Sequence, residues 1–522
     1  MLTSDLGSCR SVRSALLAAL VCVLTVGAAC EPPVEPPATP ASPVAPPNIL
    51  WVVWDTVRAD HLSLYGYGQP TTPRLGQWAR GARVFEDCTS SASSTVPSHA
   101  AMFTGLLPSE HGTHADHQFL DDKFHTVAEL LRERGYQTYL YSANPHISSA
   151  ENFHQGFEVE EHPWDPQYQA QAVRIMQAKV IPQDASSELP AKVRARRLSR
   201  WDIKASGELT GQALETWLAR RDPGRPFFAF LNYMEAHRPF VPPQRYRQRM
   251  MTPEQVQQSY RVDRSWGPMW RYVFGLHQYS QPELAVMAAT YDATLAELDD
   301  LFADLMASLE SKGHLENTVI ILTGDHGEHL GEHHLLDHQY SLYQPLIRVP
   351  LVVKYAPKFA PGRDPRPVMN FDIFPTILEL AGIPMPAGLA SKAVSLTAPR
   401  ADRVRLAEYP AVFKEPFAAV RRTNPQFDSR PWHRLLSAVI KGDYKYIRGT
   451  DSRAELYNLR DDRLEARNLL GQRPALDKQM AQALDRARAS LRLAGAPDAP
   501  VPEMTEQQRR LLESLGYVNE PK

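Results

Sequence analysis

The sequence predicts an α/β protein with a mixed, mainly parallel central sheet sandwiched by helices, followed by a small C-terminal α+β subdomain. Two observations lead to this fold class. Apolar runs of strand length alternate with amphipathic stretches of helical length through most of the 522 residues, which is the pattern of a largely parallel α/β sheet. From about Arg400 onward, the pattern changes to short alternating strands followed by one helical stretch.

Four of the apolar runs end at polar residues that can carry chemistry. "NILWVVW" is followed by Asp55, "QTYLYSA" by Asn144, and "TVIILTG" by Asp325 and His326, while "FFAFLNYM" leads to His237. Because ligands of open α/β sheets bind outside the carboxyl ends of the strands, we expect these side chains to converge on one site. Taken singly, each has an alternative as an ordinary turn residue or a structural histidine.

The remaining elements follow in chain order. "TVAELLRERG" predicts a helix that ends at Gly135, and "ELAVMAATYDATLAELDDLFADLMASLESKG" predicts a long amphipathic helix that ends at Gly313. "RVPLVVKYAP" predicts a further central strand, and "FDIFPTILELAG" predicts the helix after it. The C-terminal strands lie in "LSAVIKGDYKYIRG" and "AELYNL", ahead of the helix "PALDKQMAQALDRARASLRLAG".

The N-terminus is typical of an exported protein. Arg10 and Arg13 precede the apolar run "ALLAALVCVLTVGAAC", which is short for a membrane span and ends at Cys30. We therefore expect a signal peptide of the lipoprotein type over residues 1–30 and a proline-rich linker over residues 31–47. This predicts a protein of the bacterial periplasm or cell surface that contacts the membrane only through a lipid on Cys30. A disordered leader without an anchor is the alternative.

Charge and cysteine content argue against two kinds of site. The formal net charge of −2 offers no basic surface for nucleic acid, so we expect no nucleic-acid partner. Removal of the signal peptide takes away Cys9 and Cys22, and lipidation would occupy Cys30, which leaves only Cys88. We therefore expect neither a disulfide framework nor a thiolate metal cluster in the folded part.

The segment "GDHGEHLGEHHLLDH" concentrates side chains that bind metals. It holds nine imidazole or carboxylate side chains: Asp325, His326, Glu328, His329, Glu332, His333, His334, Asp337 and His338. Such ligands suit a divalent cation such as Mg, Ca, Mn or Zn. A solvated, histidine-rich loop is the alternative.

The stretch "SSTVPSHAAMFTG" offers hydroxyl groups just ahead of an apolar helix. Ser93, Ser94, Thr95 and Ser98 compete there as nucleophiles, and a plain loop with a helix N-cap is the alternative. Because Pro97 is favoured in the first turn of a helix, a hydroxyl just before it would lie near N–H groups that stabilise an anion.

An ordered set of motifs gives the sequence a family resemblance. Over roughly residues 48–518 it contains, in order, "PNILWVVWDTVRADHLSLYGY", "STVPSHAAMFTGLLPSEHG", "FLNYMEAHRPFVPP", "GDHGEHLGEH", "SLYQPLIRVPLVV", "FDIFPTILELAGI", "ELYNLRDDRLEARNLL" and "LESLGYV". This set resembles the sulfatase family of the alkaline phosphatase superfamily. The resemblance implies an alkaline phosphatase-like fold, with a catalytic domain over residues 48–400 and a C-terminal subdomain over residues 401–522.

The resemblance singles out one hydroxyl. "TVPSHAAMFTG" aligns with the sulfatase pattern without a gap and places Thr95 at the nucleophile position. Thr95 replaces the Cys or Ser that sulfatases oxidise to formylglycine, and His99 replaces an Arg. We therefore expect no formylglycine and a Thr95 alkoxide as the nucleophile.

The metal site is implied by the same resemblance. It assigns Asp55, Thr95, Asp325 and His326 to one divalent metal ion. Typical sulfatases have one carboxylate more at this site, and the imidazole of His326 shifts the preference toward Mn or Zn, with Ca or Mg as alternatives.

The resemblance also implies residues that face the substrate. His237 matches a family histidine beside the substrate, and His338 lies where a Lys or His contacts the transferred group or the leaving oxygen. Either one is a candidate general acid. Asn144 and His99 are candidate ligands of substrate oxygens.

These assignments predict a metal-dependent hydrolase that cleaves a sulfate or phosphate-type ester of a small molecule, glycan or lipid through Thr95. The first alternative is a phosphodiesterase or phosphonate monoester hydrolase, or a transferase of a phosphorus-containing group. The second alternative is a non-catalytic binding protein on the sulfatase fold. Loops such as residues 163–200 and 263–281 would recognise the organic part of the substrate, or merely cap the core.

Overall fold

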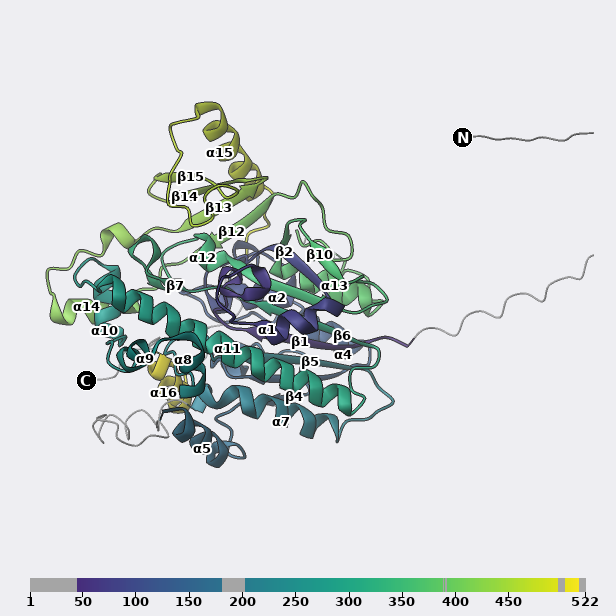
Figure 1. Cartoon of the computed structure of the whole chain (residues 1–522). Coiled ribbons are helices and arrows are strands. Elements are labelled where there is room, and N and C mark those ends of the chain that lie inside the picture. Colours follow the sequence, from purple (N-terminus) through teal and green to yellow (C-terminus); the bar gives the residue numbers. More distant parts are fainter. Residues whose placement is uncertain (1–44, 181–201, 388, 390–391, 496–502, 516–522) are drawn as a thin grey trace, which may run out of the picture. The chain divides into compact units, whose positions relative to one another are not determined.

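A computed structural model describes residues 45–180, 202–387, 389, 392–495 and 503–515 (Figure 1). The predicted signal peptide and almost all of the predicted linker lie outside these residues, as does most of the second half of the 163–200 loop. Within the described part of the chain, no helix has the length and apolar character needed to cross a membrane. Residues 46–522 group into one compact unit.

The central sheet has the predicted mixed, mainly parallel character. Its nine strands are β1 (Asn48–Trp54), β2 (Arg83–Thr89), β3 (Gln137–Ser142), β4 (Val159–Glu161), β5 (Phe227–Tyr233), β6 (Thr318–Gly324), β9 (Arg348–Lys354), β10 (Gly362–Asp364) and β11 (Val368–Met369). Their order is β10-β2-β9-β6-β1-β5-β3-β4, with β11 also paired to β2. β6, β1, β5, β3 and β4 run parallel to one another, whereas β9 is antiparallel to both β6 and β2. The fold class is therefore confirmed.

Both faces of this sheet are covered, because successive residues of β1 enter two different cores. Leu50, Val52 and Trp54 pack with one set of helices: α1 (Pro73–Trp78), α5 (Gln169–Val180), α7 (Ser206–Leu218) and α11 (Gln281–Ser311). Ile49 and Trp51 pack with the other set: α2 (Thr95–Thr104), α4 (Val127–Glu133) and α13 (Ile373–Leu380). Figure 1 shows α11 running across one face of the sheet. A strand buried on both faces reads as one apolar run, as β1 does.

The long helix α11 begins and ends at the signals that its sequence carries. The Ser280 side chain caps the helix by accepting from Glu283 N, and Glu283 returns a bond to the Ser280 backbone. This capping box starts the helix slightly before the predicted stretch. After Ser311 the chain leaves the helix, and Gly313 adopts a left-handed φ of 73°.

The C-terminal subdomain is a second, antiparallel sheet. Its order is β12 (Arg405–Tyr409), β13 (Leu436–Lys441), β14 (Tyr444–Gly449) and β15 (Ala454–Asn458). Helix α15 (Pro474–Ala489) covers one face. The other face packs against α10 (Trp266–Val273), α14 (Glu415–Thr423) and the chain around Tyr340. The predicted 263–281 loop thus contains α10 and contributes to this core.

The remaining α-helices and strands of the described chain are short. They are α3 (Pro108–His111), α8 (Gln244–Met250), α9 (Pro253–Ser259), α12 (Gln344–Ile347), α16 (Glu506–Leu515) and the two-stranded hairpin of β7 (His329–Leu330) with β8 (Leu336–Asp337). Leu511 of α16 packs with Ala143 and Met234, which follow the central strands β3 and β5. The last helix therefore returns to the central sheet.

Candidate metal and catalytic centre

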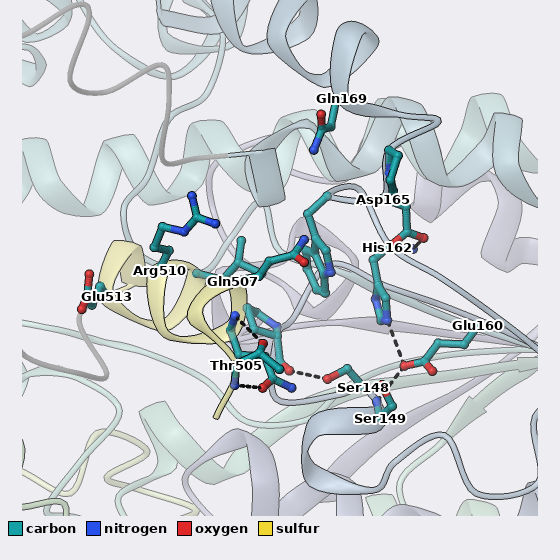
Figure 2. Close-up of a pocket in the computed structure, with 15 residues that line it drawn as sticks. Ser148, Ser149, Glu160, His162, Asp165, Gln169, Thr505, Gln507, Arg510 and Glu513 are labelled. Atoms are coloured by element: carbon teal, nitrogen blue, oxygen red, sulfur yellow. Dashed lines mark hydrogen bonds and ion pairs between the residues drawn. The ribbon is translucent and has the colours of Figure 1, made fainter. Parts of the chain in front are cut away.

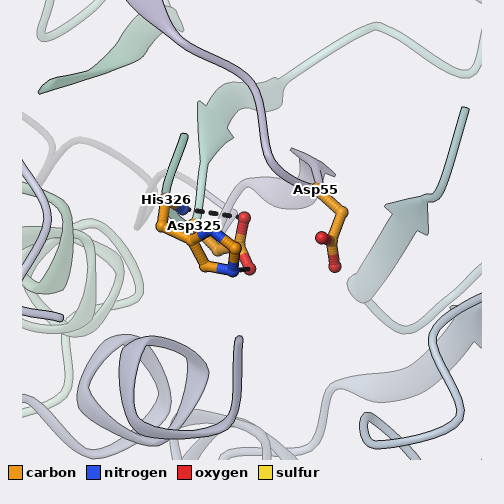
Figure 3. Close-up of side chains that lie close together, drawn as sticks. All are labelled: Asp55, Asp325 and His326. Atoms are coloured by element: carbon orange, nitrogen blue, oxygen red, sulfur yellow. Dashed lines mark hydrogen bonds and ion pairs between the residues drawn. The ribbon is translucent and has the colours of Figure 1, made fainter. Parts of the chain in front are cut away.

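Four neighbouring strands deliver polar side chains to one edge of the central sheet. Asp55 follows β1, Asp325 and His326 follow β6, and Asn144 and His237 lie just beyond β3 and β5. Because these strands are parallel neighbours in the order β6-β1-β5-β3, their carboxyl ends meet. Figure 3 shows Asp55 opposite the adjacent pair Asp325 and His326. The expected convergence is observed.

Backbone N–H groups hold Asp325 by one oxygen and leave the other oxygen available. Asp325 Oδ1 accepts from Thr56 N at 3.1 Å and from His326 N at 2.8 Å. Asp325 Oδ2 has no hydrogen-bond partner among the described residues and lies 3.3 Å from His326 Nε2. The Ser98 hydroxyl and the Asn370 amide both donate to the Asp325 carbonyl oxygen, at 2.7 and 3.2 Å. The main chain is thus anchored to helix α2 and to the segment before α13.

Asp55 is likewise held through one of its two carboxylate oxygens. The Asn144 amide donates to Asp55 Oδ2 at 2.7 Å, while Asp55 Oδ1 has no hydrogen-bond partner in the described chain. Asn144 Oδ1 accepts from His146 N at 3.0 Å. Its amide nitrogen thus orients the Asp55 carboxylate, and its predicted contact with substrate oxygens stays a prediction.

His326 presents a lone pair to the same centre. Its Nδ1–H donates to Gly327 O at 2.9 Å, which leaves Nε2 unprotonated in the neutral ring. Gly327 is required at the next position, because a Cβ there would lie 2.0 Å from the Pro345 carbonyl oxygen. The absence of a side chain at residue 327 therefore lets the loop pack against the Pro345 backbone, which positions the neighbouring His326.

These groups fit a divalent cation. One ligand atom each from Asp55, Asp325 and His326 lies within 4.8 Å of the other two, and all three side chains are fully buried. Burial raises the pKa of Asp55 to about 7, with help from Asp325, and raises the pKa of Asp325 to about 7 against its two backbone N–H donors. Burial also lowers the pKa of His326 to about 4. Two buried carboxylates with unsatisfied oxygens beside a neutral imidazole are what a bound cation would stabilise.

Thr95 is the first residue of α2, and its hydroxyl reaches this group. Thr95 Oγ1 lies 3.2 Å from His326 Nε2. The first N–H groups of a helix lack intrahelical partners and favour anions. Of the competing hydroxyls, Ser98 is committed to the Asp325 carbonyl. Ser94 is the N-cap residue and makes no side-chain cap bond.

His99 lies one turn beyond Thr95 and is engaged by protein groups at both ring nitrogens. Its Nδ1–H donates to the Thr95 carbonyl oxygen at 3.0 Å and lies 3.5 Å from Asp325 Oδ2. The Asn232 amide donates to His99 Nε2 at 3.4 Å. Burial lowers the pKa of His99 to about 3, so the ring is neutral. Its predicted contact with substrate oxygens stays a prediction.

His237 and His338 lie at the same edge of the sheet. Their ring centroids are 5.3 Å apart, and the His338 ring lies 4.6 Å from that of His326. His237 Nδ1–H donates to Arg238 O at 2.5 Å. Burial lowers the pKa of both His237 and His338.

The hairpin β7–β8 brings together side chains that had been given no role. His329 pairs with Asp337 and Leu330 with Leu336, so the chain doubles back and Glu328 approaches Asp337 and His338. Arg238 Nε donates to Asp337 Oδ2 at 2.8 Å. Sequence reasoning counted Glu328 and Asp337 in the histidine-rich segment but did not pair them.

Two other members of that segment are occupied elsewhere. Glu332 forms an ion pair with the buried Arg58 at 2.6 Å. His333 stacks on Tyr343 and donates to the Leu464 carbonyl oxygen at 2.8 Å. Neither belongs to the group of Asp55, Asp325 and His326.

A pocket of about 860 Å³ borders the segment that follows Asn144. Pro145, Ser148 and Ser149 line it from that segment, and Trp164 lines it with its ring stacked on His162 at 4.3 Å. Figure 2 shows α16 on one side of the pocket and the residues around Glu160 and His162 on the other. The lining is polar, with hydroxyl, amide, carboxylate and guanidinium groups.

Comparisons with known proteins agree with this architecture. The family described as "Sulfatase" matches residues 47–383, and "N-sulphoglucosamine sulphohydrolase, C-terminal" matches residues 331–493. The multifunctional alkaline phosphatase superfamily protein PehA of Trinickia caryophylli is 27% identical over 64% of this chain and 74% of its own length. The choline-sulfatase of Rhizobium meliloti is 25% identical over 90% of this chain and 91% of its own.

Solved structures share the fold. The phosphonate monoester hydrolase of Silicibacter pomeroyi superposes with a TM-score of 0.65 at 20% identity, over 85% of this chain and 95% of that one. A protein solved in complex with its substrate D-glucosamine-2-N,6-O-disulfate superposes with a TM-score of 0.62 at 18% identity, over 85% and 98%.

Proposed function

The chain belongs to the sulfatase family, whose members bind a metal ion and hydrolyse ester bonds, and we propose that it cleaves a sulfate or phosphate-type ester with Thr95 as the nucleophile. The observation that carries this proposal is the position of the Thr95 hydroxyl. It lies at the N-terminus of α2 and 3.2 Å from a nitrogen of the buried group Asp55, Asp325 and His326. An activated hydroxyl beside an anion-stabilising helix end is the arrangement that nucleophilic attack on an anionic ester requires.

Each residue of the centre has one task in this proposal. Asp55, Asp325 and His326 hold the cation, which when bound supplies positive charge that lowers the pKa of the Thr95 hydroxyl and offsets the charge of the ester. One imidazole among the carboxylates favours Mn or Zn. The N–H groups at the start of α2 bind the oxygens of the transferred group. His338 gives a proton to the leaving oxygen, whereas the Nδ1–H of His237 is engaged by the Arg238 carbonyl oxygen.

Thr95 also argues for phosphorus esters. Its oxygen would attack phosphorus while the bond to the leaving oxygen breaks, and water would then hydrolyse the ester left on Thr95. A formylglycine sheds sulfate by elimination through its second hydroxyl, and a threonine has no second hydroxyl. Phosphoryl esters of threonine can be hydrolysed with metal assistance, whereas sulfur is poorly activated toward such attack.

The organic part of the substrate would occupy the pocket beside residues 145–149. Its hydroxyl, amide and carboxylate groups suit a hydroxyl-rich molecule such as a sugar, and the Trp164 ring offers an apolar face. A lipid head group is the competing occupant.

The test is a substrate panel with a variant at residue 95. Aryl sulfate, aryl phosphate, aryl phosphodiester, phosphonate monoester and glycosyl phosphate are assayed with Mn, Zn, Mg and Ca, after expression in a host without the formylglycine-generating enzyme. We expect activity on phosphorus esters without maturation. Thr95→Ala should lose roughly 10³-fold or more in kcat, as removal of an enzyme nucleophile does.

Matched variants separate the nucleophile from its surroundings. Ser94→Ala removes the neighbouring hydroxyl and should keep most activity, and Thr95→Ser should retain part of it. Thr95→Ala that remains active contradicts the nucleophile, and faster turnover of aryl sulfate than of every phosphorus ester contradicts the preference. No turnover of any ester would favour a binding protein.

A further inference from the structure

A second group of buried ligands adjoins the first. One ligand atom each from Glu328, Asp337 and His338 lies within 4.8 Å of the other two, and each side chain is at most 4% exposed. The His338 ring lies 4.6 Å from the ring of His326, which belongs to the first group. The two groups therefore stand side by side at the carboxyl edge of the sheet.

Glu328 is the side chain in this group that lacks a partner. Neither of its carboxylate oxygens accepts a hydrogen bond from any described residue, although the side chain is 1% exposed. His338 Nδ1 lies 3.6 Å from its Oε2. A buried carboxylate without hydrogen bonds is costly, and natural proteins place such groups where a ligand completes them.

His338 points one ring nitrogen between two carboxylates. Its Nδ1 lies 3.1 Å from Asp337 Oδ1 and 3.6 Å from Glu328 Oε2. Arg238 Nε donates to the other oxygen of Asp337, Oδ2, at 2.8 Å. Two carboxylate oxygens and one imidazole nitrogen converge here, as they do in the first group.

We propose that Glu328, Asp337 and His338 bind a second divalent cation, of the zinc or manganese class, beside the one held by Asp55, Asp325 and His326. Its binding through His338 Nδ1 would leave the ring proton on Nε2, at the opposite side of the imidazole. His338 would then be fixed in the tautomer that donates a proton to a leaving oxygen. In this last respect the inference rests on the proposed function, whereas the cation site itself does not.

The test counts and locates metal without using activity. The full chain is loaded with Zn²⁺, desalted and analysed for zinc per protein, and a crystal is measured at the zinc absorption edge. We expect two zinc ions per chain and two anomalous peaks, one in each group. One zinc ion with a single peak at Asp55, Asp325 and His326 would overturn the proposal.

Variants assign the second ion to its ligands. Glu328→Gln and Asp337→Asn should each lower the content from two zinc ions to one, while Glu316→Gln, an exposed glutamate after α11, should keep two. Far-ultraviolet circular dichroism restricts the comparison to folded variants, and two ions in folded Glu328→Gln would contradict the assignment. Two zinc ions per chain without turnover of any ester would support the second cation site and contradict the proposed function. One zinc ion per chain with turnover would support the proposed function and contradict the second site.

Discussion

Two groups of buried charges in this protein are organised in opposite ways. In the first, Lys179 Nζ lies 2.6 Å from Glu297 Oε1 and 3.6 Å from Glu235 Oε1, and Lys204 Nζ donates to the Met234 carbonyl oxygen at 2.5 Å. Glu235 also accepts from Ser206 Oγ at 3.0 Å. We call Lys179, Lys204, Glu235 and Glu297 the lysine–glutamate network.

The metal and catalytic centre has the same depth of burial but lacks such pairing. Asp55, Asp325 and Glu328 each keep at least one carboxylate oxygen without a hydrogen bond from the described residues. In the lysine–glutamate network, by contrast, Lys179 pairs with both glutamates and Lys204 donates to backbone carbonyl oxygens. Burial of charge alone therefore does not identify a functional site. Unsatisfied oxygens that converge with other ligand atoms on one centre do, because a bound cation would complete them together.

The largest effect that separates the two groups is expected in the lysine–glutamate network. Lys179→Met removes one partner of a buried ion pair and leaves Glu297 and Glu235 without their cation. We expect the free energy of unfolding to fall by about 3–5 kcal/mol, measured by guanidinium denaturation. Lys179→Met combined with Glu297→Leu should recover much of this loss. A loss below 1 kcal/mol in Lys179→Met would show that the network does not depend on its pairing.

In the metal centre, removal of a buried charge should not lower the free energy of unfolding, in contrast to its effect in the lysine–glutamate network. Asp325→Asn keeps an oxygen for the N–H groups of Thr56 and His326 but removes a buried charge, so the metal-free variant should be at least as stable as metal-free wild type. Zn²⁺ at 100 times its Kd should raise the free energy of unfolding of wild type by about 2.7 kcal/mol through the first site alone. It should stabilise Asp325→Asn less. Calorimetry with and without Zn²⁺ measures both, and equal stabilisation of the two proteins would contradict the ligand assignment.

The smallest effect is a pH dependence within the lysine–glutamate network. Burial lowers the pKa of Lys204 from 10.5 to about 7. Between pH 7 and 10 the unfolded chain holds a proton that the folded chain has lost, so this residue makes stability rise with pH. Below pH 7 Lys204 is protonated in both the folded and the unfolded chain, so the free-energy cost of burying its charge is complete and does not change with pH. Relative to Lys204→Met, wild type should gain on the order of 1 kcal/mol per pH unit from pH 7 to 9.

Denaturant unfolding of both proteins at pH 6, 7, 8 and 9 tests this dependence. The difference between them should be flat from pH 6 to 7 and then grow in favour of wild type. A difference that stays constant to pH 9 would mean that Lys204 remains charged in the folded protein.

Much of the fold could be predicted because its strands are buried on both faces. β1, β3, β5 and β6 each read as one apolar run that ends at a polar residue, and their parallel pairing makes those ends meet. The antiparallel direction of β9 could not be predicted, since strand pairing depends on contacts distant in sequence. The short edge strands β10 and β11 carry no apolar run of their own.

The candidate site also has residues that could be predicted from the sequence and residues that could not. Asp55, Asp325 and His326 could be found because each follows a strand directly. Glu328 and Asp337 meet only through the β7–β8 turn, in which His333 and His334 adopt φ values of 53° and 60°. Histidines are not the residues that signal such a turn in a sequence. The contact of Asn144 with Asp55 likewise depends on the neighbouring positions of β1 and β3, which lie on either side of β5.

The β7–β8 hairpin has a consequence for how this site can change over generations. Its strands are two residues long, and the pairing of His329 with Asp337 decides which side chains meet Glu328. Because a strand alternates its sides at every residue, loss or gain of one residue in the turn would rotate Asp337 to the opposite side. Residues 331–335 can therefore exchange their identities more freely than their number. Drift in this loop should proceed by substitution, with its length preserved wherever Glu328 and Asp337 are kept together.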